Sequence, residues 1–231
     1  RELVLDLNEM AAGARMLPNY FRFGGVNRDL PRGFSERALQ AMNTIERHLS
    51  EFSAIYEKSP LFLRRFRDVG VLSAANAVEW GAVGPGLRAS GVKFDVRRDD
   101  PYSIYDRFEF DVVVGKKGDN LDRFLMRVEE IKQSIRIVRQ ALKELPSGPP
   151  QAKAPVLSIP EGEASSRIET PRGEGCYYLV SDGGPRAVRM KIKSPSLTNM
   201  YVARRQMLGE KLQDAVVILG TWDPVLGEID R

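Results

Sequence analysis

The sequence predicts a mainly α-helical fold with a small antiparallel β-sheet, an α+β protein. Three observations support this prediction: two long helical patterns in the first two-thirds of the chain, three short strand patterns after a proline-rich segment, and further helical patterns near the C-terminus. The chain has 231 residues, of which 42% are apolar and 29% charged. This composition is ordinary for a globular protein and provides enough apolar material for a core.

The first 146 residues are predicted to form a helical bundle. Apolar residues at steps of three and four over residues 1–12 predict a helix that stops at Gly13. A second helix is predicted to start near Ser35. Its apolar positions are Leu39, Met42, Ile45, Leu49, Phe52 and Ile55. The strongest pattern covers 119–145 and ends before a proline. A helix of that length with one apolar face needs other helices to cover it, which favours a bundle.

Shorter elements are expected between these helices. Ser73 is predicted to cap a short helix over 73–80. A glycine-rich loop is expected from Gly81 to Gly91, and a polar stretch rich in charge and tyrosine over 95–106. Residues 14–33 are expected to be irregular because proline and glycine interrupt them.

The last third begins with a predicted linker over 147–163, which is rich in proline, alanine, glycine and serine. Three short strands joined as a meander are then predicted, at Ser165–Glu169, Cys176–Ser181 and Ala187–Lys193. One or two helices should fill 197–219, ahead of a C-terminal loop from Thr221 to Arg231. We therefore divide the chain into a bundle region (1–146), the linker, and a β-meander with C-terminal helices (164–231), all in one domain whose N-terminal part is missing.

Several classes of function are excluded by composition. A single cysteine, Cys176, cannot form an intramolecular disulfide, and it cannot by itself build a thiolate zinc site or an iron–sulfur cluster. The only histidine, His48, lies in a helical pattern beside charged residues and is interpreted as a surface residue. No stretch approaches the roughly 18–20 apolar residues of a membrane helix. The net charge of +4 is small, and no nucleic-acid module is visible. The chain opens at Arg1 inside an amphipathic pattern, so we expect it to be part of a longer protein.

Polar motifs in the loops carry most of the functional information. The stretch Gly84-Pro85-Gly86-Leu87-Arg88-Ala89-Ser90-Gly91 has glycines for tight turns, and Arg88 can hold a carboxylate by a forked hydrogen bond. Asp95, Arg97, Tyr102 and Tyr105 follow closely. Taken alone, these residues are better explained by an arginine–carboxylate network that holds the loops together than by a binding site.

Further motifs follow in a fixed order along the chain. They are Gly13-Ala14-Arg15-Met16, Asn19 to Val26, Gly84 to Gly91, Asp95 with Arg97, Pro101-Tyr102, Tyr105-Asp106, Gly118-Asp119, Asp122-Arg123, Arg127 to Glu130, Gln133-Ser134, Arg136-Ile137, Pro171 to Glu174, Leu179 to Gly183, Lys191 to Lys193, Pro195, and Gly227 to Arg231. In this order they resemble the C-terminal portion of the hydrogenase-like large subunit (the D-type subunit) of complex I-type NADH or deazaflavin:quinone oxidoreductases. The resemblance covers essentially the whole chain apart from the linker.

The resemblance implies a fold like that of the nickel–iron hydrogenase large subunit, but without its chemistry. Those hydrogenases end in Asp-Pro-Cys-x-x-Cys, whereas this chain has Asp223-Pro224-Val225-Leu226-Gly227-Glu228. Valine and one carboxylate cannot replace two metal-binding thiolates, so hydrogenase activity is excluded. The resemblance implies that the vacated metal cavity became a quinone headgroup pocket. Many relatives also carry a histidine near the neighbouring subunit's cluster where this chain has Leu17, so tuning of the cluster by that imidazole is not expected.

The implied function is electron transfer to quinone, coupled to ion translocation in a respiratory complex, with this chain forming one wall of the quinone chamber. The chain is expected to bind no cofactor or metal. Quinone is the substrate, the iron–sulfur cluster belongs to the adjacent subunit, and NAD or deazaflavin binds elsewhere in the complex. Expected partners are the cluster-bearing subunit, other peripheral-arm subunits and the membrane-arm subunit where quinone enters, with no nucleic acid. The expected location is the cytoplasmic face of the plasma membrane, by peripheral attachment through the complex.

The predicted site lies mainly in the C-terminal loop. Asp223 and Glu228 are predicted catalytic carboxylates that organise hydrogen bonding and protons for quinone reduction. The predicted quinone-binding residues are Val225, Gly227, Arg231, Arg172 and Arg88. Two alternatives stay open: a subunit of a group 4 membrane-bound hydrogenase-related ferredoxin or sulfane oxidoreductase, and a non-catalytic helical scaffold. The sequence does not identify the electron donor, the quinone or the transported ion.

Overall fold

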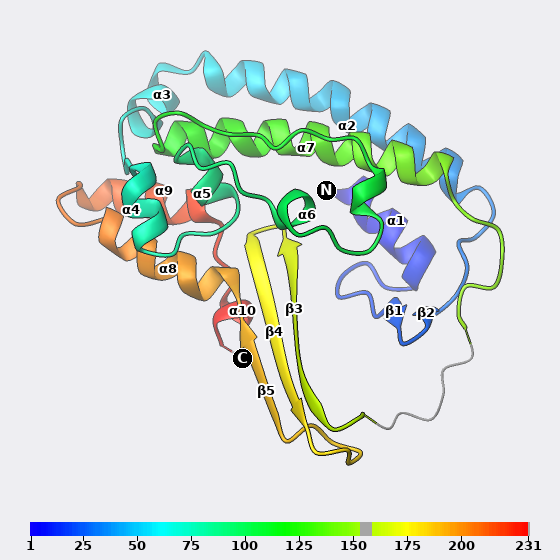
Figure 1. Cartoon of the computed structure of the whole chain (residues 1–231). Coiled ribbons are helices and arrows are strands. Elements are labelled where there is room, and N and C mark those ends of the chain that lie inside the picture. Colours follow the sequence, from blue (N-terminus) through cyan, green and yellow to red (C-terminus); the bar gives the residue numbers. More distant parts are fainter. Residues whose placement is uncertain (153–158, 231) are drawn as a thin grey trace.

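Two long helices form one layer of the structure, a computed structural model that describes residues 1–152 and 159–230. Helices α2 (Phe34–Glu57) and α7 (Asn120–Lys143) lie side by side along the top of Figure 1. Ile135 of α7 packs against Ala41 and Met42 of α2, whereas Phe124 packs near Phe52. The two helices are therefore antiparallel, and the long helical patterns predicted from the sequence are confirmed.

The apolar stripe of α2 is only partly covered. Met42 and Leu49 are buried, but Leu39, Phe52 and Ile55 are 39%, 43% and 69% exposed, although all were predicted as one apolar face. The stripe is broader than the surface that α1 (Glu2–Ala12), α3 (Pro60–Phe66) and α7 present to it. As predicted, α1 stops at a left-handed glycine, Gly13.

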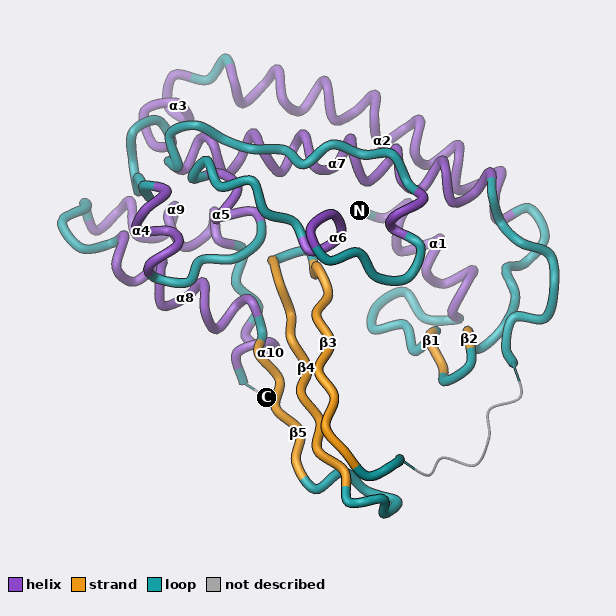
Figure 2. Tube along the Cα trace, in the orientation of Figure 1, coloured by secondary structure: helices purple, strands orange, loops and turns teal. Residues whose placement is uncertain are grey.

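Several short elements connect the long helices. One of them was predicted, and the others lie where the sequence indicated loops. The expected helix capped by Ser73 is present as α4 (Ala74–Glu79), with the Ser73 hydroxyl accepting the Asn76 amide. The predicted glycine-rich loop is wrong in its centre, because α5 (Pro85–Ala89) forms there, with a proline at its first position. The polar stretch likewise contains α6 (Val96–Asp99) and a 3₁₀ turn (Tyr105–Arg107), and the irregular segment contains a hairpin, β1 (Phe21–Arg22) and β2 (Gly25–Val26). Figure 2 shows α4, α5 and α6 separated by teal loops between α3 and α7, and the hairpin β1–β2 beside α1.

The three predicted strands are confirmed as an antiparallel meander of order β3-β4-β5: β3 (Gly162–Thr170), β4 (Gly173–Ser181) and β5 (Arg189–Lys193). Thr170 pairs with Gly173, so only Pro171 and Arg172 form the turn between β3 and β4. In Figure 1 the sheet projects away from the helices, and this turn lies at the end beside them. The turn is therefore the part of the sheet that meets the helical core.

The principal core joins the C-terminal helices to the loops after α3. It contains buried residues of α4, α5, α8 (Pro195–Gln206) and α9 (Leu212–Trp222), and of the loops that flank α4. They are Leu72, Ala77, Ala82, Leu87, Val202, Ala203, Ile218 and Trp222. Two helices in 197–219 are confirmed, but α9 extends three residues further, and the expected C-terminal loop contains α10 (Leu226–Ile229).

Part of the predicted linker lies outside the described residues, which omit 153–158. At its start, the Pro150 carbonyl accepts the Val26 amide and the Ala152 amide donates to the Gly24 carbonyl. Its last two residues already belong to β3. Composition could not predict these backbone pairings, because any residue can make them. Among the described residues, no helix is long and apolar enough to cross a membrane.

Candidate functional site

The turn between β3 and β4 is seated against α5 and α8 by close backbone contact. A Cβ atom at Gly84 would overlap the Gly173 backbone, and both glycines have positive φ, so glycine is required on each side. From α8, the buried Asn199 amide donates to the carbonyls of Val83 (3.4 Å) and Arg172 (3.1 Å). These contacts fix the backbone from which the Arg172 side chain extends.

Arg172 binds the C-terminal segment at two carboxylates. Its Nε donates to the Asp223 carbonyl oxygen (2.8 Å), and its Nη2 lies 3.3 Å from Asp223 Oδ2. Its Nη1 lies 3.7 Å from Glu228 Oε1. One guanidinium therefore joins the two carboxylates that the sequence singled out.

The segment from Asp223 to Glu228 is held in an unusual conformation. Asp223 ends α9 with a left-handed φ of 51°, which is uncommon outside glycine and asparagine. On α8, the Ser196 hydroxyl donates to Glu228 Oε2 and accepts the Val225 amide (3.3 Å). Asp223 thus turns the chain sharply, and Ser196 and Arg172 secure the turn.

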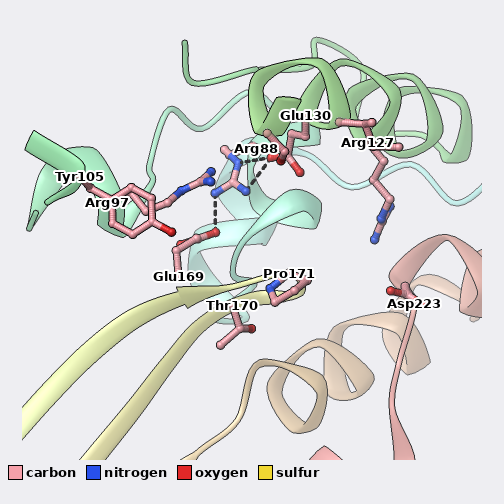
Figure 3. Close-up of a pocket in the computed structure, with 11 residues that line it drawn as sticks. Arg88, Arg97, Tyr105, Arg127, Glu130, Glu169, Thr170, Pro171 and Asp223 are labelled. Carbon is pink, nitrogen blue, oxygen red and sulfur yellow. Dashed lines mark hydrogen bonds and ion pairs between the residues drawn. The ribbon is translucent and has the colours of Figure 1, made fainter. Parts of the chain in front are cut away.

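A polar hollow of about 440 Å³ lies between α7, the end of β3 and Asp223 (Figure 3). Three arginines and three carboxylates contribute to its walls, together with the Tyr105 ring. Its lining residues are Arg88, Arg97, Tyr105, Arg127, Glu130, Ile131, Ser134, Glu169, Thr170, Pro171 and Asp223. Asp223 therefore belongs both to the hollow and to the segment held by Arg172.

Arg88, from α5, is the centre of a buried ion network beside the hollow. Only 2% of its surface is exposed. Its Nε and Nη2 both donate to Glu130 Oε1 (2.9 and 2.6 Å), and its Nη1 donates to Glu169 Oε1 (2.8 Å). Nη1 also donates to the Phe94 carbonyl (3.1 Å). The guanidinium is thus directed at three acceptors of the protein itself.

Two carboxyl groups of the network, Glu169 and Asp95, have pKa values shifted in opposite directions. Burial raises the pKa of Glu169 above its usual value, against the opposing effect of Arg88. Although burial opposes it, the forked bond from Arg97 lowers the pKa of Asp95, to which Arg97 donates at 2.9 and 2.6 Å. Burial also raises the pKa of Tyr102, whose hydroxyl accepts the Glu169 amide, to about 12. Glu169 therefore holds a proton more readily than Asp95 does.

A second buried arginine stabilises the approach to Asp223. Arg123 donates from Nε to Thr221 Oγ1 (3.0 Å), from Nη1 to the Gly118 carbonyl (2.8 Å) and from Nη2 to the Gly70 carbonyl (2.9 Å). Burial lowers its pKa to about 9, because these neutral acceptors do not compensate for lost hydration as carboxylates would. Arg123 therefore ties the end of α9 to α7.

The structure brings some of the predicted site residues together and separates others. Asp223 and Arg88 line the same hollow, and Arg172 binds Asp223 and Glu228. Val225, Gly227 and Glu228 lie in the adjoining turn and are not among the lining residues. Arg231 lies outside the described residues. The forked arginine–carboxylate bond predicted for Arg88 is present, with both donors on one oxygen of Glu130.

Four charged lining residues were not predicted as site residues: Arg97, Arg127, Glu130 and Glu169. The first three lie in motifs noted in the sequence, whereas Glu169 was noted only as the end of a predicted strand. Arg127 and Glu130 belong to a polar row on α7 at alternating steps of three and four, the spacing of one helix face. The row is Asn120, Arg123, Arg127, Glu130 and Ser134. This polar period is visible in the sequence, alongside the apolar positions that predict the helix.

His48 and Leu17, both discussed from the sequence, lie on the surface. His48 is exposed on α2 and bonds Glu51 (3.1 Å), which confirms its interpretation as a surface residue. Leu17 is 92% exposed and has a positive φ of 54°. Within residues 1–152 and 159–230, no group of three or more His, Cys, Asp or Glu could hold a metal ion.

Chemically, the hollow suits a neutral polar molecule that bears hydrogen-bond acceptors. Its three arginines supply donors, and the three carboxylates that line it offset their charge, so the ligand itself need not be charged. Burial raises the pKa of Glu169, so its protonated form is favoured more than that of an exposed glutamate.

Comparison with known proteins identifies relatives along the whole chain. The family described as "Respiratory-chain NADH dehydrogenase, 49 Kd subunit" matches residues 1–161 and 151–231. The chain is 45% identical over 240 residues to the NADH-quinone oxidoreductase D subunit 1 of Roseiflexus sp., with 100% of this chain and 64% of that protein covered. It is 44% identical over 232 residues to the NADH-quinone oxidoreductase D subunit of Dehalococcoides mccartyi and, equally, to that of Clostridium beijerinckii, in each case over 100% of this chain and 63% of the relative. The chain thus spans slightly less than two thirds of the length of these curated relatives.

Proposed function

The chain belongs to the family of the respiratory-chain NADH dehydrogenase 49 kDa subunit, and from that premise we propose that it forms one wall of a quinone-binding chamber in an ion-translocating quinone oxidoreductase. The relatives' names specify NADH and quinone. We extend both to the complex that contains this chain, with deazaflavin as the alternative donor. The hydrogenase-like fold and the single-domain organisation predicted from the sequence are part of this proposal.

One observation carries the proposal: Arg172 binds the carboxylates of both Asp223 and Glu228, and Asp223 also lines the polar hollow. This arrangement supports a site in which quinone oxygens accept hydrogen bonds while nearby carboxylates organise protons. Val225 lies between the two carboxylates in the sequence, and on this proposal it contacts the quinone ring from the segment that adjoins the hollow. Arg88 acts from the opposite wall by holding Glu130 and Glu169 in place.

The rest of the reaction belongs to other subunits. We propose that the electron comes from an iron–sulfur cluster of the adjacent subunit, that NAD or deazaflavin binds elsewhere in the complex, and that this chain holds neither. Other peripheral-arm subunits and a membrane-arm subunit at the mouth of the chamber complete the assembly. On this proposal the chain lies at the cytoplasmic face of the plasma membrane and attaches through its partners.

The proposal is tested by Val225→Met and Glu228→Gln in the assembled complex. Quinone reduction, inhibitor affinity and the amount of complex are measured together. We expect fully assembled enzyme with reduced turnover for Glu228→Gln and altered inhibitor affinity for Val225→Met. Arg139→Met is a suitable control, because Arg139 lies on α7 and bonds Asn43 and Glu46, away from the hollow.

Two outcomes would contradict the proposal. Unchanged kinetics in both variants would remove the C-terminal turn from the site. Loss of assembly without any kinetic change in the remaining complex would support a non-catalytic scaffold, in which Arg172 and its two carboxylates only fasten the C-terminal segment.

A further inference from the structure

The polar hollow shares a wall with a second, apolar hollow of about 370 Å³. Arg127 and Asp223 line both hollows. The second hollow is otherwise lined mainly by Phe66, Phe124 and Val217. Arg127 and Asp223 therefore stand at a junction where a polar environment changes to an apolar one.

Arg127 differs from the other arginines of the polar hollow. Arg88 and Arg97 direct their donors at carboxylates. For Arg127, the part of the chain that the structure describes shows one hydrogen bond, from Nη1 to the Arg123 carbonyl (3.0 Å). A guanidinium has five N–H donors, so most of those on Arg127 are available for a ligand. Figure 3 shows its side chain extending from α7 toward Asp223.

The electrostatic environment of Arg127 also favours binding of a ligand to its guanidinium. Burial lowers the pKa of Arg127, although the charge of Asp223 opposes this effect. Its guanidinium is therefore poorly hydrated and lacks a closely paired carboxylate. A ligand oxygen that accepts its hydrogen bonds would replace the missing water.

The apolar hollow is kept open by a glycine. Gly220 of α9 lines it and is exposed, so the hollow can be reached from solvent on that side. A Cβ atom at Gly220 would meet no atom within 4 Å. On the other side the rings of Phe66 and Phe124 are arranged edge to face, with centroids 6.1 Å apart. These walls suit an alkyl or isoprenoid chain better than a polar group.

We propose that Arg127 is a binding residue for a quinone-type ligand, donating hydrogen bonds to a ring oxygen while the ligand's apolar chain occupies the hollow formed by Phe66, Phe124, Val217 and Gly220. This inference rests on the proposed function and adds the anchoring residue and the course of the chain. It requires an amphiphile with hydrogen-bond acceptors at one end, and it requires no charge on the ligand.

The test compares two benzoquinones in the assembled complex, one without a tail and the other with the same ring and a ten-carbon chain. For Arg127→Met we expect KM to rise about tenfold to a hundredfold for both quinones, as expected for the loss of a hydrogen bond to a charged group. For Gly220→Leu we expect KM to rise about tenfold for the tailed quinone only, equivalent to keeping two methylene groups out of apolar surroundings. The helix should tolerate the change because nothing lies within 4 Å of the added Cβ.

Matched controls are available on the same helices. Val216→Leu adds bulk on the exposed face of α9, and Arg139→Met removes a cation further along α7. Equal effects of Gly220→Leu on both quinones, or none on either, would overturn the course of the chain. A KM within twofold of wild type for Arg127→Met would overturn the anchor, and if that variant fails to assemble, Arg127→Ala is measured by the same criterion.

Failure of this inference is distinguishable from failure of the proposed function. If Val225→Met and Glu228→Gln alter quinone kinetics while the Arg127 and Gly220 variants do not, the quinone site stands and the anchor is elsewhere. If none of the four variants alters quinone kinetics, the proposed function fails as well.

Discussion

Gly86→Ala should destabilise the protein strongly, because α5 is seated directly on the Trp222 ring. A Cβ atom at Gly86 would overlap ring carbons Cζ3 and Cη2 of Trp222 and would lie 2.8 Å from Cε3. Carbon atoms pack at about 3.5–4.0 Å, so the ring must retreat by roughly 1 Å or more. Trp222 is 1% exposed, and its Nε1 donates to Gln206 Oε1 (2.6 Å), so the ring has no free direction to move.

The cost has two parts. Overpacking a filled core costs about 1–3 kcal/mol, and displacing the indole from its buried partner adds about 1–3 kcal/mol. We therefore expect Gly86→Ala to lower the free energy of unfolding by about 2–6 kcal/mol. Gly220→Ala is the matched control, because its added Cβ meets nothing within 4 Å. In helix α9 it should be neutral or stabilising by up to about 1 kcal/mol.

Equilibrium urea unfolding of both variants measures this difference. Trp222→Phe removes the ring atoms that the new methyl group would meet, so the cost of Gly86→Ala should fall by at least about 1 kcal/mol in that background. A cost below about 1 kcal/mol in the wild-type background would refute the packing of α5 on Trp222. An equal cost in both backgrounds would show that the strain arises elsewhere.

Three further predictions concern the buried polar groups. Although burial opposes it, pairing with Arg97 lowers the pKa of Asp95 below its ordinary value of 3.8. The stabilisation from Asp95 is therefore present above pH 3.8 and is lost as pH falls through the folded-state pKa. Asp95→Asn should lose less unfolding free energy than the wild type when the pH falls below about 4. Glu169→Gln should have the opposite signature. Burial raises the pKa of Glu169 above its ordinary value of 4.5, so its stabilisation is complete below pH 4.5 and is lost as pH rises through the higher folded-state pKa. The variant should remove that decline in urea titrations run upward from pH 4.5. Thr221→Val should cost about 1–3 kcal/mol in thermal or urea unfolding, because Arg123 Nε loses its acceptor at 3.0 Å, and an unchanged stability would contradict the bond.

Periodic elements could be predicted from the sequence because their pattern repeats over many turns. The apolar repeats of α2 and α7 and the three short strand patterns placed these elements correctly. Short helices were missed where glycine and proline dominate. In α5, Pro85 begins the helix and Gly86 is required by Trp222, so a composition typical of loops reflects packing against a distant residue.

The candidate site could be predicted only where its residues lie in local sequence motifs. Arg88 and Asp223 were singled out because they lie in recognisable motifs. Glu169, the acceptor for Arg88, lies 81 positions away in the sequence, and no local pattern connects the two. Arg127 was accessible through the polar row of α7, but its importance depends on the two hollows that meet beside it. Contacts between residues far apart in the sequence depend on tertiary packing, which the spacing of residues along the chain does not reveal.

The most direct test of the account is photoaffinity labelling of the assembled complex with an azido-substituted quinone, followed by peptide mapping of this chain. The account predicts labelling of peptides that contain residues 169–172 and 217–228, suppressed by excess unmodified quinone. Quinone-protected labelling confined to other parts of the chain, such as α2, would contradict the assignment of the quinone site to Arg172, Asp223 and the adjoining hollows.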